Sequence, residues 1–280
     1  MPLRSSEFQG RSVKEERGEE MARICPLFSG STGNSYYIGT KSAGVLVDAG
    51  RSAKQMEGML RSCEIDPLAV AGILITHEHT DHISGVRVLA KRYQIPVFAS
   101  RGTLTALSGK LDGVHTYIVP DGLQLAGMTI QTFHTPHDCA ESLGYRIKTH
   151  DDRVITVATD IGHLSEEVIN GLLGADFVVL ESNHDTMMLR DGSYPYYLQR
   201  RILSDRGHLC NDACAAFLVE LAKTGTTRFL LAHLSRENNT RALALETALS
   251  ALTAAGFAPG TDFILDAARE SNSSGQSIIF

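Results

Sequence analysis

The stretch "THEHTDH", residues 76–82, places three histidines and two acidic residues within seven positions of the chain. It follows the apolar run "GILI" (72–75) and precedes a predicted helix that begins near Ser84. Imidazole nitrogens and carboxylate oxygens are the usual ligands of zinc and manganese in proteins. Residues two apart on an extended turn point the same way, so His77 and His79 can share one ion while Asp81 and His82 reach another. We therefore predict a metal-binding turn here, with a solvated polar turn as the alternative.

Further polar residues stand directly after apolar runs elsewhere in the chain. The candidates are Asp48 after "GVLV", His137 after a proline turn, Asp160 after "VITVAT", His184 after "VVLESN" and His233 after "FLLA". In α/β sheets, ligands bind outside the carboxyl ends of the strands. The sequence therefore predicts one site at one edge of the sheets, and a pair of ions there would need ligands from several of these positions.

Short apolar runs alternate with longer helical stretches, a pattern typical of the α/β class with mixed sheets. We expect strands at 22–29, 35–39, 44–50, 71–77, 96–100, 128–134, 143–149, 153–160, 176–182, 228–233 and 277–280, and helices at 52–61, 84–92, 211–223 and 237–255. No internal repeat interrupts this pattern. A chain of 280 residues with 43% hydrophobic content fits one large domain better than two small ones.

The first 21 residues differ in composition from the rest of the chain. They are rich in charge and lack an apolar run, so we expect a disordered tail over residues 1–21 rather than a secretory signal or a membrane span. Met21 is also a candidate translation start. The domain is then expected over residues 22–280.

The formal net charge of −6 and a sequence pI near 6.0 exclude a strongly basic surface, so any contact with nucleic acid needs a local basic patch. Five scattered cysteines in a chain of this size favour a reducing compartment, for which the cytoplasm is the default. Buried apolar thiols are the expected state of Cys210 and Cys214, since no second pair completes a zinc spacing. The sequence predicts no membrane span and leaves the oligomeric state open.

The order of these motifs resembles that of the metallo-β-lactamase fold superfamily over nearly the whole chain from Met21. The resemblance implies an αββα sandwich of two mixed sheets flanked by helices, with a dinuclear site at one edge. It assigns His77, His79 and His137 to one divalent ion, Asp81, His82 and His233 to the other, and Asp160 as the bridge. Asp48 would hydrogen-bond a ligand of the metal turn and fix its orientation.

Longer stretches narrow the resemblance to the YycJ/WalJ branch, small metal-dependent phosphohydrolases regarded as DNA exonucleases. They are "SGSTGNSYYIG", "THEHTDHISGV", "TDIGHLS", "LESNHD" and "LAHLSRENN". The branch implies DNA as the substrate and hydrolysis of its phosphodiester bonds. Two ions, Zn²⁺ or Mn²⁺, would hold the attacking hydroxide and stabilise the leaving oxygen. Asp81 and Asp160 are then expected to be catalytic. His208 in "RGHLCND" is the candidate proton donor, with a surface histidine in a helix-capping segment as the alternative.

Four more residues are candidates for substrate binding. Ser31 and Asn34 belong to a glycine-rich loop that can donate hydrogen bonds to an anion, although a hairpin turn explains them equally well. Asn211 begins a predicted helix whose N-terminal N–H groups can meet a phosphate. His184 suits either the site or a structural hydrogen bond. Arginines between Met187 and Asn239 form either a strip that follows a nucleic-acid backbone or an ordinary solvated helix face. Tyrosines in the same region either stack on bases or pack on the core.

Fold alone does not select the reaction. A small-molecule metallohydrolase, either a cyclic-nucleotide phosphodiesterase or a thioesterase, is the second hypothesis. A metal-binding regulatory protein without turnover is the third, although the complete set of candidate ligands argues against it.

Overall fold

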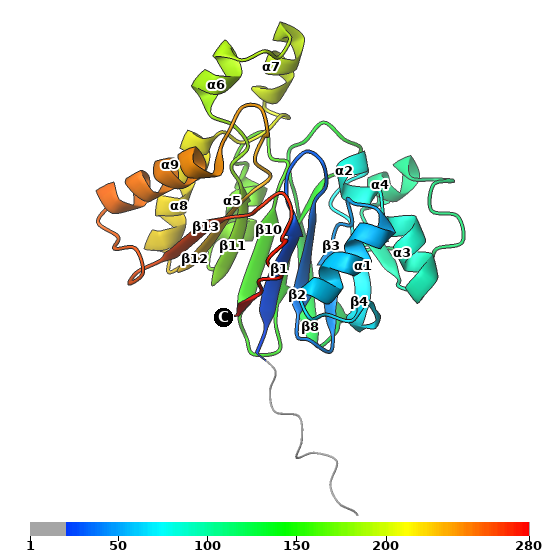
Figure 1. The fold of residues 1–280 in the computed structure, drawn as a ribbon. Coiled ribbons are helices and arrows are strands. Elements are labelled where there is room, and N and C mark those ends of the chain that lie inside the picture. The colour runs from blue at the N-terminus through cyan, green and yellow to red at the C-terminus, as the bar shows by residue number, and fades with distance from the viewer. Residues whose placement is uncertain (1–20, 280) are drawn as a thin grey trace, which may run out of the picture.

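A computed structural model describes residues 21–279. Two seven-stranded sheets pack face to face, with helices on both outer faces (Figure 1). The predicted αββα sandwich is therefore confirmed. The predicted tail over residues 1–21 lies outside the described residues except for Met21, so this boundary stays a prediction. In the described part of the chain, no helix is long and apolar enough to cross a membrane.

The first sheet has the strand order β14-β1-β2-β3-β4-β5-β6. Its strands are β1 (Arg23–Phe28), β2 (Ser35–Gly39), β3 (Gly44–Val47), β4 (Val70–Leu74), β5 (Val97–Ala99), β6 (Thr116–Ile118) and β14 (Ile278–Ile279). Its outer face is covered by α1 (Ala53–Ser62), α3 (Val86–Tyr93) and α4 (Arg101–Ala106), with η1 (Pro67–Ala69) before β4. β3 to β6 pair in parallel and β1 to β3 antiparallel, so the sheet is mixed as predicted.

The second sheet has the order β13-β12-β11-β10-β9-β8-β7. Its strands are β7 (Leu123–Leu125), β8 (Met128–His134), β9 (Leu143–Lys148), β10 (Val154–Ala158), β11 (Phe177–Glu181), β12 (Arg228–Ala232) and β13 (Ile264–Ala267). Helices α5 (Glu166–Leu172), α8 (Asn211–Lys223) and α9 (Arg241–Ala254) cover it. The helix expected from residue 237 begins only at Arg241, because the side chain of Thr240 caps it by accepting from the N–H of Leu243.

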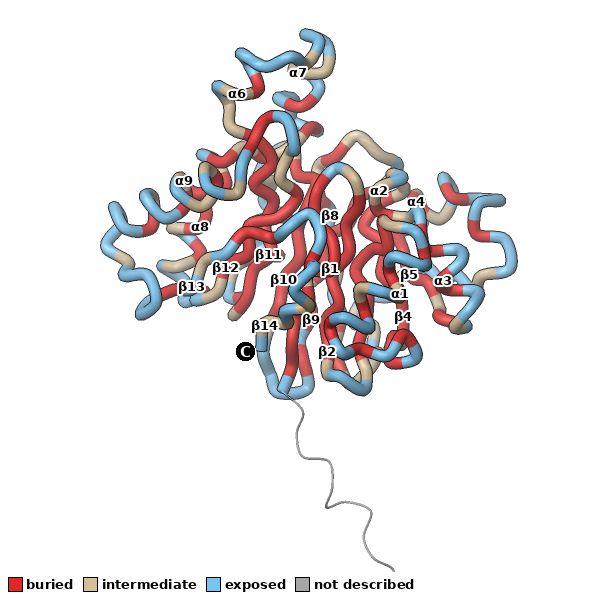
Figure 2. The backbone as a smooth tube through the Cα atoms, viewed as in Figure 1, coloured by how far each residue is buried: buried red, intermediate tan, exposed pale blue. Residues whose placement is uncertain are grey.

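The core lies in three layers, one between the sheets and one under each set of helices. Figure 2 shows the strands buried along most of their length and the helices buried on one side only. Tyr36 and Tyr145 are fully buried in the layer between the sheets. This packing holds the strand ends rigidly, which positions the loops that follow them.

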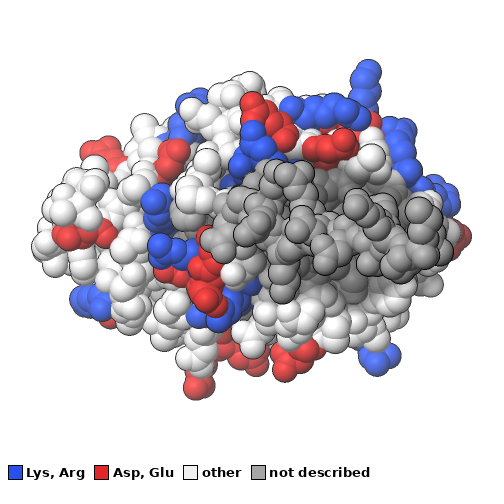
Figure 3. Space-filling model, turned by 90° about the horizontal axis from the view of Figure 1, so that it is seen from below, with Lys and Arg blue, Asp and Glu red and all other residues white. Residues whose placement is uncertain are grey.

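Three short helices lie at the edge where those loops meet. They are α2 (Thr80–Ile83), α6 (Thr186–Asp191) and α7 (Tyr196–Ile202), and the last two stand out from the body of the molecule (Figure 1). The face seen from below, on the opposite side, shows basic and acidic side chains intermingled wherever described residues form it (Figure 3). Neither positive nor negative charge predominates on that visible surface.

Candidate metal centre

The site is built on loops that leave the strands abruptly. Asp48, Asp160 and His233 each follow the end of a strand, and all three have a left-handed backbone, with φ of 62°, 57° and 52°. Such a backbone is uncommon outside glycine and costs roughly 1–3 kcal/mol at each position. The fold accepts this strain at three positions of one site.

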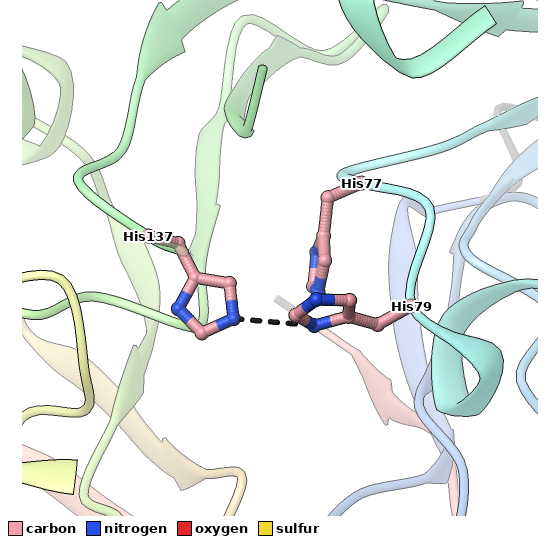
Figure 4. Close-up of side chains that lie close together, drawn as sticks. All are labelled: His77, His79 and His137. Carbon is pink, nitrogen blue, oxygen red and sulfur yellow. Dashed lines mark hydrogen bonds between the residues drawn. The ribbon is translucent and has the colours of Figure 1, made fainter. Parts of the chain in front are cut away.

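A first group of ligand atoms comes from His77, His79 and His137. One ring nitrogen from each lies within 4.8 Å of the others. Figure 4 shows the three rings converging from the turn after β4 and from the loop after β8, with Nε2 of His137 3.3 Å from Nδ1 of His79. Burial, and then the charge of His82, hold the pKa of His77 well below its usual range, so its ring stays neutral as a metal ligand must be.

A second group joins Asp81, His82 and His233, again with ligand atoms within 4.8 Å of one another. Nε2 of His82 lies 3.5 Å and Nε2 of His233 3.7 Å from Oδ2 of Asp81. Helix α2 already includes Asp81 and His82, so the expected extended turn ends at His79 and a helical turn carries the other two ligands. Asp81, His82 and His233 therefore lie together as expected from the sequence, although Asp81 and His82 have a helical backbone instead of the extended one expected.

Asp160 lies between the two groups. Its Oδ1 is 3.8 Å from Nε2 of His137 in the first group, and its Oδ2 is 3.3 Å from Nε2 of His82 in the second. Burial would raise the pKa of this carboxyl, but the charges of His233 and His82 outweigh it and hold the pKa well below the usual range. Asp160 is therefore an ionised carboxylate within reach of both groups.

Several atoms at this position lack the partners that buried polar atoms require. Nε2 of His77, Nε2 of His233 and Oδ2 of Asp160 are buried without a hydrogen-bond partner among the described residues. Each such atom costs roughly 1–3 kcal/mol if it stays unpaired. They belong to the first group, the second group and the carboxylate between them, so a pair of divalent cations fits the donors that are present.

In most of these histidine rings, the nitrogen that does not face the ion position already has a hydrogen-bond partner. Nδ1 of His82 lies 2.7 Å from Oδ2 of Asp48. Oδ2 also accepts from the hydroxyl of Thr76, and Oδ1 of Asp48 accepts from the backbone N–H of Thr76. Nδ1 of His137 lies 3.2 Å from the carbonyl oxygen of Gly207. Such partners fix the tautomer and direct the remaining nitrogen of each ring toward an ion.

Glu181, at the end of β11, is fully buried, and no sequence pattern singles it out. Its Oε1 lies 2.8 Å from Nδ1 of His208 and 2.8 Å from Nδ1 of His233. Its Oε2 accepts from the backbone N–H groups of Ile161 and Leu209. Burial would raise the pKa of Glu181, but the charge and hydrogen bond of His208, with those of His233, lower it to about 2. Since both oxygens are occupied, Glu181 orients the two rings and has no lone pair to spare for an ion.

A cavity of about 240 Å³ opens above the two groups. His79, His137, Asp160 and His233 line its floor. Its walls include Ser31, Asp138, Tyr194, Arg201 and His208. The predicted proton donor His208 and the predicted anion-binding Ser31 therefore face the space above the candidate ligands.

The other three predicted substrate-binding residues lie away from the cavity wall. Asn34 is fully buried, and its amide holds the carbonyl of Gly30 and approaches Oδ2 of Asp81. Asn211 is bound by Ser182 and Asn239 beneath the surface. His184 is buried as well, with neither ring nitrogen hydrogen-bonded among the described residues. The side chains of Asn34 and Asn211 hold neighbouring loops together through these hydrogen bonds, and none of the three residues lines the cavity.

Comparison with known proteins agrees with this geometry. The family described as "Beta-lactamase superfamily domain" matches residues 44–234. The chain belongs to the beta-lactamase superfamily. Within the solved structures, Zn(2+)-bound PqqB from Methylobacterium extorquens has a TM-score of 0.69 at 14% identity, covering 92% of this chain and all of that one.

Curated relatives are more similar in sequence. Exodeoxyribonuclease YycJ of Bacillus anthracis is 39% identical over 242 residues, which is 85% of this chain and 91% of the relative. Exodeoxyribonuclease WalJ of Streptococcus pneumoniae serotype 2 is 38% identical over 244 residues, which is 85% of this chain and 90% of the relative. The resemblance expected from the sequence motifs is therefore confirmed.

Proposed function

We propose that the protein is a DNA exonuclease that hydrolyses phosphodiester bonds with two divalent metal ions, Zn²⁺ or Mn²⁺. The similarity to exodeoxyribonucleases over nine-tenths of their length carries the proposal. It is supported by the two groups of candidate ligands beneath one cavity. The matches to hydroxyacylglutathione hydrolases span only 33% of the chain, so they favour a thioesterase much less.

His77, His79 and His137 would hold one ion, and Asp81, His82 and His233 the other, with Asp160 between them. When bound, such a pair of ions acidifies water and neutralises the charge of a phosphodiester in its transition state. Asp48 and Glu181 would keep His82 and His233 in the tautomer that presents Nε2.

His208 would supply the proton that the leaving 3′ oxygen needs. Its Nδ1 is held by Glu181, so a proton on Nε2 can be directed into the cavity that His208 lines. The buried carboxylate fixes the orientation of the ring. Transfer of that proton lets the oxygen leave as a hydroxyl instead of an alkoxide.

Arg201 and Ser31 would bind the phosphate groups that flank the scissile bond. Both line the cavity, and Arg201 forms an ion pair with Asp138 on the same wall. We further propose a cytoplasmic location, since all five cysteines are free and such thiols persist in a reducing compartment.

The test is digestion of end-labelled linear duplex DNA in Mn²⁺. Wild type is expected to shorten the DNA progressively from an end and to leave a closed circular plasmid intact. The double variant Asp160→Asn, His82→Ala should lose this activity, whereas Asp112→Asn, His115→Ala, on exposed residues, should retain it. Linear DNA that stays intact with metal-loaded wild type would refute the proposal in favour of a small-molecule hydrolase.

A further inference from the structure

The two short helices α6 and α7, with the turn between them, form an arm over residues 186–203 that rises beside the cavity (Figure 1). Its base is anchored, because Leu189 is fully buried and Ile202 is 8% exposed. Its outer part is open to solvent (Figure 2). An anchored base and an exposed end are what a fixed contact surface requires.

The arm carries exposed large side chains of a kind that usually packs inside proteins. Tyr196 is 74% exposed, Tyr197 is 75% exposed and Met187 is 60% exposed. Single exposed apolar residues need no explanation, but a group of them on one projection marks a contact surface. The alternative expected from the sequence, that these tyrosines pack on the core, is therefore wrong for Tyr196 and Tyr197.

The motif "YYLQRR" (196–201) places an arginine one helical turn after each tyrosine. Residues four apart on a helix are neighbours, so Tyr196 is next to Arg200, and Tyr197 is next to Arg201. Each pair offers an aromatic face for a base and a cation for the adjoining phosphate. Over the arm, three arginines stand against one aspartate, although the whole chain has a net charge of −6. Arg201 also pairs with Asp138 on the cavity wall, and Arg190 and Arg200 have no such partner among the ion pairs of the described residues.

The arm is continuous with the cavity. Tyr194, Leu198, Arg201 and Ile202 all belong to the arm and line the cavity. Tyr197 precedes Arg201 by one turn, so it lies at the rim on the same side of α7. A strand that rests on Tyr197 can therefore continue into the space above the candidate ligands, and Tyr196 extends the aromatic surface outward from it.

We propose that this arm binds the unpaired bases of a single-stranded DNA segment as it enters the metal centre, with bases stacking on Tyr196 and Tyr197. The proposal rests on the proposed nuclease function and names the form of DNA that the site accepts. Bases inside a duplex are covered on both faces by their neighbours and cannot stack on a side chain, whereas unpaired bases can.

The test measures binding without turnover. A fluorescein-labelled single-stranded 12-mer with phosphorothioate linkages, and a blunt duplex of the same sequence, are titrated with the full chain by anisotropy. The double variant Tyr196→Ala, Tyr197→Ala is expected to bind the single strand about 30-fold more weakly, the lower end for two lost stacking contacts. Binding of the blunt duplex should change less than about threefold.

The double variant Tyr196→Phe, Tyr197→Phe keeps both rings and should bind the single strand as wild type does. Tyr117→Ala removes an exposed tyrosine from β6 and should also leave binding unchanged. 2-Aminopurine near the end of the 12-mer should be quenched by wild type, by the Phe variant and by Tyr117→Ala, but not by the double Ala variant. Equal losses on single strand and duplex, full binding by the Ala variant, or loss in the Phe variant would overturn the proposal. Failure of the DNA digestion would refute the nuclease function and leave this binding result standing.

Discussion

Oδ2 of Asp48 lies 2.7 Å from Nδ1 of His82, and both side chains are buried beneath the metal centre. This contact ties one candidate ligand to the end of β3 and commits one of its two ring nitrogens. The same carboxylate holds the backbone N–H and hydroxyl of Thr76 at the start of the metal turn. A residue 34 positions away in sequence thus determines how the turn presents His82.

Replacement of Asp48 by Asn should weaken metal binding while preserving the fold. Asn tolerates the left-handed backbone at this position, but it removes the charge that favours the required tautomer of His82. We expect metal affinity to fall about 10- to 100-fold in competition with a chromophoric chelator. Asp112→Asn, at an exposed position, should not alter the affinity. An unchanged affinity in Asp48→Asn would mean that the hydrogen bond is only structural.

If His208 is the proton donor proposed above, His208→Ala should reduce the turnover of DNA about 10²- to 10⁴-fold, because the leaving 3′ oxygen then departs without a proton. The loss should be much smaller for a nucleotide 4-nitrophenyl ester, since 4-nitrophenolate leaves without a proton. Steady-state kinetics on both substrates would show the difference. Equal losses on both substrates would assign His208 to binding instead of proton transfer.

Glu181→Gln should differ from His208→Ala by affecting metal binding as well as turnover. Gln cannot accept from both rings and both backbone N–H groups at once, so the orientation of His233 is lost with that of His208. We expect a fall in metal affinity of at least about tenfold, measured by chelator competition. Glu246→Gln on the exposed face of α9 is the matched control. Wild-type metal affinity in Glu181→Gln would show that His233 is oriented by other contacts.

The site residues that sequence predicts are those that stand close together in the chain or that follow the end of an apolar strand. Histidines crowded into seven positions, or polar residues after strongly apolar strands, are patterns that coordination chemistry explains. Glu181 has no such pattern, because it is a single glutamate that ends a buried strand, and its role depends on where β11 lies beside β12. Asn34 and Asn211 are predicted to bind substrate because their amides can form hydrogen bonds. The sequence does not distinguish an amide on a cavity wall from one in a buried hydrogen-bond network.

The secondary structure likewise includes elements that sequence predicts well and elements that it misses. Strands with continuous apolar runs, such as β2 and β11, were predicted nearly to the residue because both of their faces are buried. The edge strand β6 was missed because all three of its residues are exposed. The arm was missed as structure because its short helices bury few residues, so hydrophobic periodicity gives little signal there.

Metal loading should stabilise the protein through the unpaired atoms of the site. Each ion at about 100 times its dissociation constant contributes about 2.7 kcal/mol, which corresponds to a rise in Tm of roughly 5–10 °C per ion for a domain of this size. Differential scanning fluorimetry of chelator-treated protein, with and without Zn²⁺ or Mn²⁺, measures it. Asp160→Asn should lose most of the rise and Asp112→Asn none of it. A Tm that does not respond to either metal in wild type would contradict a built metal centre.

Gly50 marks the closest approach of two site loops, and its substitution tests whether their packing supports the centre. A Cβ at Gly50 would lie 1.7 Å from the carbonyl oxygen of Asp81, so the metal turn would have to shift. We expect Gly50→Ala to lower the free energy of unfolding by more than about 2 kcal/mol and to weaken metal binding. Denaturant unfolding and chelator competition measure the two effects.

Gly58 is the matched control for this substitution. It lies exposed within α1, and a Cβ there would meet no atom within 4 Å. Gly58→Ala should therefore stabilise the protein by roughly 0.5–1 kcal/mol, because alanine loses less conformational freedom in a helix. If Gly50→Ala lowers the free energy of unfolding and Gly58→Ala raises it, the cost at Gly50 arises from contact with the loop of Asp81 and not from the loss of glycine itself. If Gly50→Ala proved as stable as wild type, this loop would be free to move and could not hold Asp81 in place.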